Sequence, residues 1–252
     1  MNQEPQLGAG IIKMNEKMIL HIGIDEAGRG PLIGDLVIAG VLVDDSTLEK
    51  LRLNGLAESK QLNSKSRNEF YKEAVRSKAV VIAVYIPPWR IDRENLNKLE
   101  EEYIVWIIGV LRRLLGENKN AEIKITIDEV KGSAKRIESF VREVFNGVKV
   151  DYRMEPGADA KYSSVALASI FAKVMRDLNL LALKKLFGDF GSGYSTDPLL
   201  LDWIKQNYKP EQNPPLFIRR SWRNLKNIAP KWYIEKKKGP WRHRSILDYA
   251  KR

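Results

Sequence analysis

Cysteine is absent from this chain, and histidine occurs only twice, as His21 and His243. Without cysteine the protein forms no disulfide and offers no thiolate to a metal, and two histidines are too few for an ordinary zinc site. Any metal must therefore be held mainly by oxygen atoms. Oxygen donors of this kind favour magnesium or manganese.

Long apolar runs are absent as well. No stretch approaches the roughly 18 apolar residues of a membrane helix. The N-terminus also has no apolar segment followed by a small-residue cleavage site. We therefore expect a cytoplasmic protein that does not enter a membrane. With 252 residues, 44% of them hydrophobic, the chain can bury the core of one domain.

Acidic residues are scarce at one end of the chain. Residues 1–200 carry 29 Lys and Arg against 28 Asp and Glu, whereas residues 201–252 carry 14 against 4. Such a segment is typical of a protein with a polyanionic partner, because Lys and Arg neutralise nucleic-acid phosphates. A merely solvating basic tail is the alternative. The segment mixes basic and aromatic residues, such as Arg219, Trp222 and Trp232, which suits phosphate contact, although we favour a core-capping role for the aromatic rings.

Strand-like and helix-like patterns alternate along the chain. Apolar or alternating runs predict strands at residues 18–25, 36–43, 79–86, 122–128 and 148–154. Helical spacing is found at residues 47–53, 64–77, 92–115, 135–145, 158–186 and 198–207. Three early strands followed by alternating helices and strands predict an α/β fold with a mixed five-stranded sheet flanked by helices.

Four acidic residues stand near the ends of these predicted elements. Asp25 and Glu26 close the first strand, Asp128 closes the fourth, and Asp159 lies in the first turn of the helix predicted from residue 158. Clustered carboxylates repel one another, so they persist only if divalent cations neutralise them or their pKa values rise. Two metal ions about 4 Å apart could then activate water for in-line attack on phosphorus. Taken alone, Asp25 and Glu26 are more typical of a polar turn between strands than of a metal site, so the assignment depends on the other two acidic residues.

Six short motifs carry a resemblance to a known family. In chain order they are Gly23–Pro31 (Gly-Ile-Asp-Glu-Ala-Gly-Arg-Gly-Pro), Ser59–Lys60, Ala158–Tyr162, Ser169–Val174, Gly191–Tyr194 and Arg219–Leu225. Together they resemble type 2 ribonuclease H, also called ribonuclease HII, and the last motif resembles its archaeal members. The resemblance implies a ribonuclease H-like fold with a helical, basic C-terminal segment. We also expect the protein to be a monomer.

The resemblance also implies roles for particular residues. In that family four acidic residues are catalytic and bind two magnesium or manganese ions, and they match Asp25, Glu26, Asp128 and Asp159. The Gly-Arg-Gly backbone contacts the 2′-hydroxyl and phosphates around a ribonucleotide, the loop tyrosine packs against the next sugar, and lysines contact phosphates. The substrate-binding residues implied here are Gly28, Arg29, Gly30, Lys60, Lys161 and Tyr194.

The implied activity is that of a metal-dependent endoribonuclease. It hydrolyses the RNA strand of RNA/DNA hybrids and cuts 5′ of ribonucleotides embedded in duplex DNA, leaving 3′-hydroxyl and 5′-phosphate ends. Such an activity serves ribonucleotide excision repair and DNA replication. Two rivals remain: another ribonuclease H-like nuclease or DNA transferase that cuts all-DNA substrates equally well, and a catalytically silent hybrid-binding protein.

Composition, charge and the resemblance together divide the chain into three parts. We expect a disordered extension at residues 1–17, a catalytic domain at 18–200 and a basic substrate-binding segment with its tail at 201–252. Within the tail, residues 243–250 resemble a motif that binds the DNA sliding clamp, although its glutamine and second aromatic residue are missing. Clamp binding and a simple terminal basic helix are the two interpretations of this end.

Three positions depart from the family's pattern. Asp35, Glu58 and Gly157 stand where proline, aspartate and a basic residue, respectively, are common. None of the three changes removes a metal ligand. The change at Gly157 removes a positive charge beside Asp159, and we expect it to weaken phosphate binding or to loosen the approach to the helix.

Overall fold

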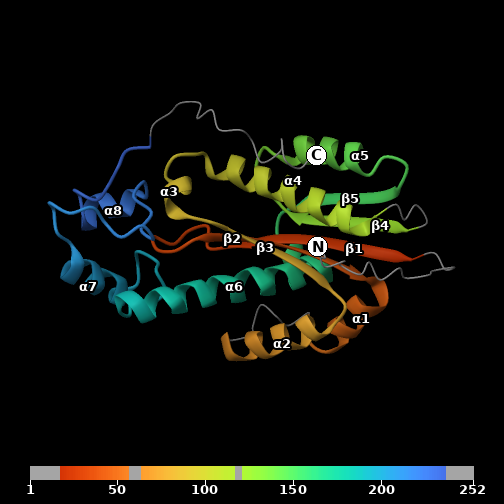
Figure 1. Ribbon diagram of the computed structural model, residues 1–252, viewed down its shortest axis with the longest axis horizontal. Coiled ribbons are helices and arrows are strands. Elements are labelled where there is room, and N and C mark those ends of the chain that lie inside the picture. Colours follow the sequence, from red (N-terminus) through yellow and green to blue (C-terminus); the bar gives the residue numbers. More distant parts are fainter. Residues whose placement is uncertain (1–17, 57–63, 117–120, 237–252) are drawn as a thin grey trace, which may run out of the picture.

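The computed structural model describes residues 18–56, 64–116 and 121–236 (Figure 1). The N-terminal extension predicted at residues 1–17, the candidate phosphate contact Lys60 and the clamp-like motif at 243–250 lie outside these described residues. The strands are β1 (Ile19–Ala27), β2 (Leu36–Asp44), β3 (Val80–Ile86), β4 (Glu122–Asp128) and β5 (Lys149–Glu155).

The five strands form one mixed sheet in the order β3-β2-β1-β4-β5. Strand β1 runs antiparallel to β2, and β2 antiparallel to β3, whereas β1, β4 and β5 run parallel. The predicted mixed five-stranded sheet is therefore confirmed. Because Ile24 of β1 pairs with Ile127 of β4, the acidic residues that follow these two positions leave the sheet side by side.

Helices cover both faces of the sheet (Figure 1). One face carries α1 (Asp45–Leu53), α2 (Ser64–Arg76) and α6 (Ser163–Phe187), and the other carries α4 (Leu96–Leu115) and α5 (Ala134–Val144). The smaller elements are α3 (Pro88–Ile91), the short 3-10 turn η2 (Ala158–Ala160), α7 (Pro198–Asn207) and α8 (Arg223–Ile228).

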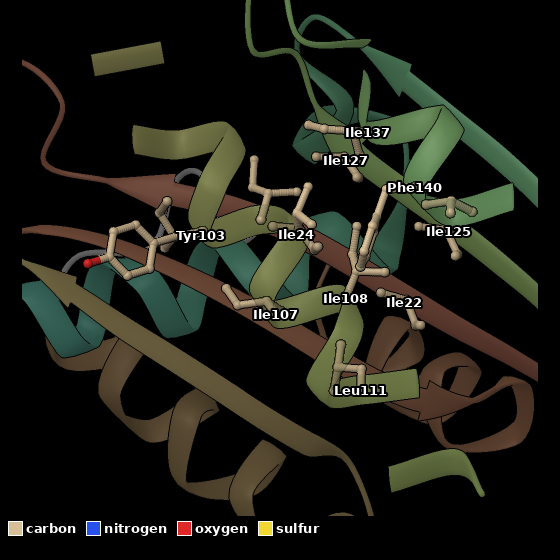
Figure 2. Close-up of a cluster of buried hydrophobic side chains, with 14 of the residues drawn as sticks. Ile22, Ile24, Tyr103, Ile107, Ile108, Leu111, Ile125, Ile127, Ile137 and Phe140 are labelled. Atoms are coloured by element: carbon tan, nitrogen blue, oxygen red, sulfur yellow. The ribbon is translucent and has the colours of Figure 1, made fainter. Parts of the chain in front are cut away.

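The main core lies between the sheet and helices α4 and α5. Ile22 and Ile24 of β1 and Ile125 and Ile127 of β4 point into it, as Figure 2 shows. Because side chains alternate along a strand, Glu26 leaves β1 on this same α4 face, whereas Asp25 faces α6. The two neighbouring carboxylates thus approach the site from opposite faces of the sheet.

Helix α6 lies directly against β1. A Cβ atom added to Gly23 would come 2.1 Å from the carbonyl oxygen of Ser164, so only glycine permits the observed spacing. Strand positions where backbones approach this closely require glycine. The contact places the first turn of α6 against Gly23, two residues before Asp25 on β1. Helix α6 therefore lies on the face of the sheet toward which Asp25 points.

The helix predicted from residue 158 is divided in the structure, and the prediction was wrong at this point. Residues Ala158–Ala160 form the turn η2, and α6 begins only at Ser163. The extended conformation of Tyr162, with φ of −122° and ψ of 120°, separates the two. Asp159 therefore lies on a separate short turn and not in the first turn of the long helix.

The predicted helix at residues 92–115 also begins later than expected. Helix α4 starts at Leu96, because the side chain of Asn95 accepts a hydrogen bond from the Lys98 N–H and caps the helix there. The short helix α3 precedes it. Within the described ranges, no helix combines the length and apolar character needed to cross a lipid bilayer.

The C-terminal segment packs against the turn that follows β1. Leu32 and Ile33 of that turn share a core with residues from α6, α7, α8 and the loops around them. Trp232 is 2% exposed in this core, and Trp222 is partly buried against it. The aromatic rings thus cap a core, as the sequence favoured, and the basic segment supports the turn beside the acidic residues.

Candidate active site

Asp25 is a buried carboxylate near the end of β1, with 7% of its surface exposed. One of its oxygens accepts a hydrogen bond of 2.8 Å from the Glu26 N–H. Burial, and next the negative charge of Glu26, raise the pKa of Asp25 to about 7. Without a cation nearby, this side chain therefore holds its proton at a pH where an ordinary aspartate is ionised.

Glu26 has a similar environment on the other face of the sheet. Burial, followed by the charges of Glu100 and Asp128, raises the pKa of Glu26 to about 7, and the charge of Arg29 opposes this effect. Two neighbouring carboxyl groups with raised pKa values are a common feature of functional sites. The ionised forms of these carboxyl groups therefore repel one another, and a bound cation would offset this repulsion.

Asp128 brings the third carboxylate from the end of β4. Its Oδ1 atom accepts a hydrogen bond of 2.8 Å from the Ala158 N–H, which fixes the side chain. Among the described residues, one carboxylate oxygen from each of Asp25, Glu26 and Asp128 lies within 4.8 Å of the others. The structure thus brings together three of the four predicted metal ligands.

Asp159 is not part of this group of closely spaced oxygens. It lies on η2, directly after the residue whose N–H binds Asp128. The backbone therefore places Asp159 beside the group, while its carboxylate lies outside the 4.8 Å spacing. Its role as a fourth ligand stays a prediction.

The donor set fits a hard divalent cation. Only carboxylate oxygens meet at this point, and such oxygens bind magnesium, manganese or calcium in preference to softer metals. A divalent cation would also stabilise the ionised forms of Asp25 and Glu26, whose pKa values burial raises. The three residues form a candidate metal centre.

A Gly-Arg-Gly turn lies immediately beyond this centre. Gly28 adopts a left-handed conformation with φ of +90°, and an added Cβ would lie 2.5 Å from the Arg176 Nε atom. At Gly30 an added Cβ would meet only the Cε1 atom of Tyr194, at 3.4 Å. Tyr194 is 44% exposed. The structure therefore brings together two predicted substrate-reading elements, the turn and the tyrosine loop.

Arg219 stabilises the Gly-Arg-Gly turn through hydrogen bonds to its backbone and to the residues that follow it. This arginine is fully buried and donates to the carbonyl oxygens of Gly34, at 2.9 Å, and of Arg29, at 3.2 Å. Trp222 adds a hydrogen bond of 3.1 Å from its indole nitrogen to the carbonyl oxygen of Gly30. The sequence placed Arg219 among residues suited to phosphate contact. That interpretation was wrong for Arg219, because its guanidinium binds backbone inside the protein.

Glu100 is a site residue that the sequence did not reveal. It lies on α4, is 0% exposed, and accepts a hydrogen bond from Arg29. Burial raises its pKa to about 7, with Arg29 opposing the shift. One signal was available, since Glu100 stands four residues after Leu96 and three before Tyr103. It therefore occupies the apolar stripe of its helix, where an ionisable residue is unusual.

Lys161 is exposed and forms an ion pair with Glu155, the last residue of β5. The lysine is the first residue after the end of η2. The structure therefore shows it as a surface cation, two residues after Asp159 along the chain. Its predicted contact with phosphate stays a prediction.

Comparison with known proteins identifies the family. The family model for ribonuclease HII matches residues 22–225 of this chain. The ribonuclease HII of Hyperthermus butylicus is 42% identical over 232 residues, covering 90% of this chain and 93% of that protein. The chain belongs to the ribonuclease HII family. The ribonuclease HII of Sulfolobus acidocaldarius is 41% identical over 223 residues, covering 88% of this chain and all of that protein.

Solved structures of ribonuclease HII agree with this assignment. The ribonuclease H2 of Pyrococcus horikoshii has a TM-score of 0.69 and 33% identity, covering 84% of this chain and 98% of that one. An Archaeoglobus fulgidus chain, solved as a PCNA:RNase HII complex, has a TM-score of 0.65 and 31% identity, covering 90% and 99%. The family and the fold predicted from the motifs are confirmed, and the protein is an enzyme of the ribonuclease H class, a hydrolase.

Proposed function

We propose that this ribonuclease HII family member hydrolyses the RNA strand of RNA/DNA hybrids and cuts 5′ of ribonucleotides embedded in duplex DNA. The products would carry 3′-hydroxyl and 5′-phosphate ends. One observation carries the proposal: one carboxylate oxygen from each of Asp25, Glu26 and Asp128 lies within 4.8 Å of the others, and the Gly-Arg-Gly turn begins two residues after Glu26. The catalytic groups and the groups that recognise the sugar would then be neighbours at the end of β1.

Two divalent ions, magnesium or manganese, are the proposed cofactors. Asp25, Glu26 and Asp128 would hold them, and Asp159 would complete the ligand set from η2. When bound, the ions supply an activated water and neutralise charge on the phosphate. The chain's own part is to keep these carboxylates close together and, for Asp25, away from bulk water. Their ionisation is then coupled to cation binding.

Recognition of the sugar is the second part of the proposal. Gly28 and Gly30 have no side chains, so a nucleic-acid backbone can come close to the peptide groups of the turn. The 2′-hydroxyl, which both donates and accepts hydrogen bonds, is the feature that distinguishes RNA from DNA locally. The backbone at Arg29 would contact the adjoining phosphates, and the exposed ring of Tyr194 would pack against the sugar that follows the ribonucleotide.

Lysine and arginine residues would hold the rest of the duplex. Lys60 and Lys161 are proposed phosphate contacts, and the segment from residue 201 onward, with 14 basic residues against 4 acidic ones, supplies most of the net positive charge. Phosphate contacts of this kind position a nucleic acid without reading its sequence. Binding should accordingly weaken as salt concentration rises.

A sliding clamp is the proposed protein partner. The Archaeoglobus fulgidus relative was solved as a complex with PCNA. In this chain residues 243–250 carry Ile246 and Tyr249 at the anchor positions of a clamp-binding motif. Removing residues 243–252 should abolish co-migration with the clamp in gel filtration while leaving cleavage of short duplexes intact.

Three matched duplexes test the proposed activity. One is all DNA, one carries a single ribonucleotide at its centre, and one is an RNA/DNA hybrid. With Mg²⁺ or Mn²⁺ we expect cleavage of the last two only, with a 3′ end that a DNA polymerase extends. EDTA should stop cleavage, and Asp25→Asn should reduce it at least about a hundredfold, the usual scale for a group that acts on the transition state.

Each rival function predicts a different result in the same experiment. Equal cutting of the all-DNA duplex would favour a general ribonuclease H-like nuclease. Tight, salt-sensitive binding without metal-dependent cleavage would favour a hybrid-binding protein. Full activity of Asp25→Asn would contradict the proposed metal centre.

A further inference from the structure

The guanidinium of Arg29 is hydrogen-bonded to two side chains in the first turns of α4. Its Nη1 atom donates to Glu100 Oε2, and its Nη2 atom donates to Asn97 Oδ1. The arginine side chain is 39% exposed, whereas that of Glu100 is fully buried. Arginine presents its donors in a planar fork, so two acceptors on one helix fix its orientation as well as its position.

Asn97 joins this contact to the end of the neighbouring strand. Its amide nitrogen donates to the carbonyl oxygen of Lys131, at 3.1 Å, while its amide oxygen accepts from Arg29. Arg29 follows the end of β1, and Lys131 follows the end of β4. The Asn97 side chain therefore links the segments that follow β1 and β4, the two strands that carry Asp25, Glu26 and Asp128.

The same arginine is held from its other end. Its carbonyl oxygen accepts a hydrogen bond from Arg219 Nη1, at 3.2 Å. The turn at Arg29 is thus fixed on the main-chain side by the C-terminal segment and on the side-chain side by α4. A residue clamped twice in this way has little freedom to change the position of the glycines on either side.

Stability does not explain why an ion pair occupies this position. Burial removes the hydration of the charges, and replacing a whole buried pair by well-packed apolar residues of similar size is often neutral or stabilising. Glu100 also leaves its Oε1 atom buried without a hydrogen-bond partner among the described residues. Unpaired buried oxygens of this kind cost free energy. A requirement other than folding must therefore favour glutamate at a position that faces the core.

We propose that Glu100 and Asn97 are positioning residues, which hold Arg29 and with it the Gly28–Gly30 turn in the place where the ribonucleotide is read. The proposal rests on the proposed function, in which this turn contacts the sugar. Neither residue needs to touch the substrate. Their effect reaches the reaction through Arg29.

Four variants test the proposal: Glu100→Met, Glu100→Gln, Arg29→Met and the double variant Glu100→Met with Arg29→Met. Glu100→Met keeps the length of the side chain and removes both oxygens, and Glu100→Gln keeps an acceptor but removes the charge. The control is Glu102→Gln on the same helix. Glu102 pairs with Arg90, which keeps its contacts with Glu94 and Tyr103 when Glu102 is changed.

We expect kcat/KM on the single-ribonucleotide duplex to fall about tenfold or more in Glu100→Met and less in Glu100→Gln, because a charge-assisted contact is lost or weakened. The double variant should be no worse than Arg29→Met alone. Melting temperature should be unchanged or higher in the double variant, which replaces the whole pair by apolar side chains. A purely structural residue would instead give a lower melting temperature and effects that multiply in the double variant. Glu102→Gln should match the wild type in kcat/KM.

A second measurement needs no activity. Amide hydrogen exchange in the ligand-free protein should be faster over residues 28–34 in Glu100→Met than in the wild type or in Glu102→Gln. Unchanged exchange together with wild-type kcat/KM in both Glu100 variants would overturn the proposal. If the wild-type protein cuts none of the three duplexes, the proposed function fails, whereas the exchange result still decides whether Glu100 positions the turn.

Discussion

The carboxylate of Asp128 accepts a hydrogen bond of 2.8 Å from the backbone N–H of Ala158. This bond joins the end of β4 to the turn η2, which carries Asp159 one residue later. Asp128 therefore has two duties, because it belongs to the candidate metal centre and also anchors the backbone that delivers the next acidic residue. The two duties can be separated by substitution.

Asp128→Asn keeps an oxygen that can accept the Ala158 bond, whereas Asp128→Ala removes it. Both variants should lose cleavage activity, because both remove a negative charge from the metal centre. In metal-free buffer Asp128→Ala should be less stable than Asp128→Asn by about 1–3 kcal/mol, the range for a buried N–H left without its acceptor. Urea unfolding of the two variants measures this difference. Equal unfolding free energies would show that the bond does not support η2.

The raised pKa of Asp25 predicts a pH-dependent cost to folding. Its pKa rises from an ordinary value of 3.8 to about 7 on folding. Between these values the folded protein keeps a proton that the unfolded chain has lost, so this residue reduces stability as pH increases through that window. Asp25→Asn should therefore be no more stable than wild type near pH 4, and its advantage should grow by up to about 1.4 kcal/mol per pH unit until pH 7.

Urea unfolding in EDTA at a series of pH values checks this result. EDTA is required because a bound cation would stabilise the ionised carboxylate and cancel the effect. The wild type and the variant share every other titrating group, so the difference between them reports the ionisation of Asp25 together with its coupling to Glu26. A difference that stays constant from pH 4 to 8 would show that the carboxyl group is ionised throughout.

Much of the site could be predicted from the sequence because local patterns determine it. The apolar runs before Asp25 and Asp128 predict strands, and β1 and β4 are parallel neighbours whose ends meet at one sheet edge. Asp159 shows where local pattern is insufficient. Helical spacing continues through residue 158, but the bond between Asp128 and Ala158 and the extended Tyr162 end the turn before α6 begins.

Two buried charged residues escaped prediction because their partners are distant in sequence. Glu100 meets Arg29 across 71 residues, and Arg219 meets the carbonyl of Gly34 across 185. A charged residue usually lies on the surface, so only tertiary contacts can show that it is buried and paired. The sequence gives no register between segments so far apart. Both residues support the same turn, which makes that turn the least predictable part of the site.

Arg219 should be sensitive even to a substitution that keeps its charge. Lysine carries one ammonium group and cannot reach the carbonyl oxygens of Gly34 and Arg29 with a planar fork. Arg219→Lys should therefore lower the free energy of unfolding by about 1–3 kcal/mol, the cost of a buried polar group left unpaired. Exposed Arg223 provides the control, since Arg223→Lys should leave stability unchanged. Chemical unfolding of the two variants gives the two free energies. Equal effects at both positions would contradict a role for the Arg219 guanidinium in holding the turn.

Two glycines of the turn should respond differently to the same added methyl group. At Gly28 the positive φ and the 2.5 Å approach to Arg176 make alanine a strained residue, so Gly28→Ala should cost about 1–3 kcal/mol of stability. At Gly30 the backbone is ordinary, and the methyl would meet only the exposed ring of Tyr194 at 3.4 Å. Gly30→Ala should accordingly fold as the wild type does.

Activity is where Gly30→Ala should fail. If the sugar of the ribonucleotide lies against the peptide group of Gly30, a methyl there occupies the space, and kcat/KM on the single-ribonucleotide duplex should fall by at least about tenfold, or about 1.4 kcal/mol. Binding of the all-DNA duplex, which depends on phosphate contacts, should change much less. Wild-type cleavage by a normally folded Gly30→Ala protein would mean that the substrate does not approach this glycine. A loss of stability would mean instead that Tyr194 cannot move aside. Gly30→Ala combined with Tyr194→Ala would then restore folding, and its cleavage would be compared with that of Tyr194→Ala alone.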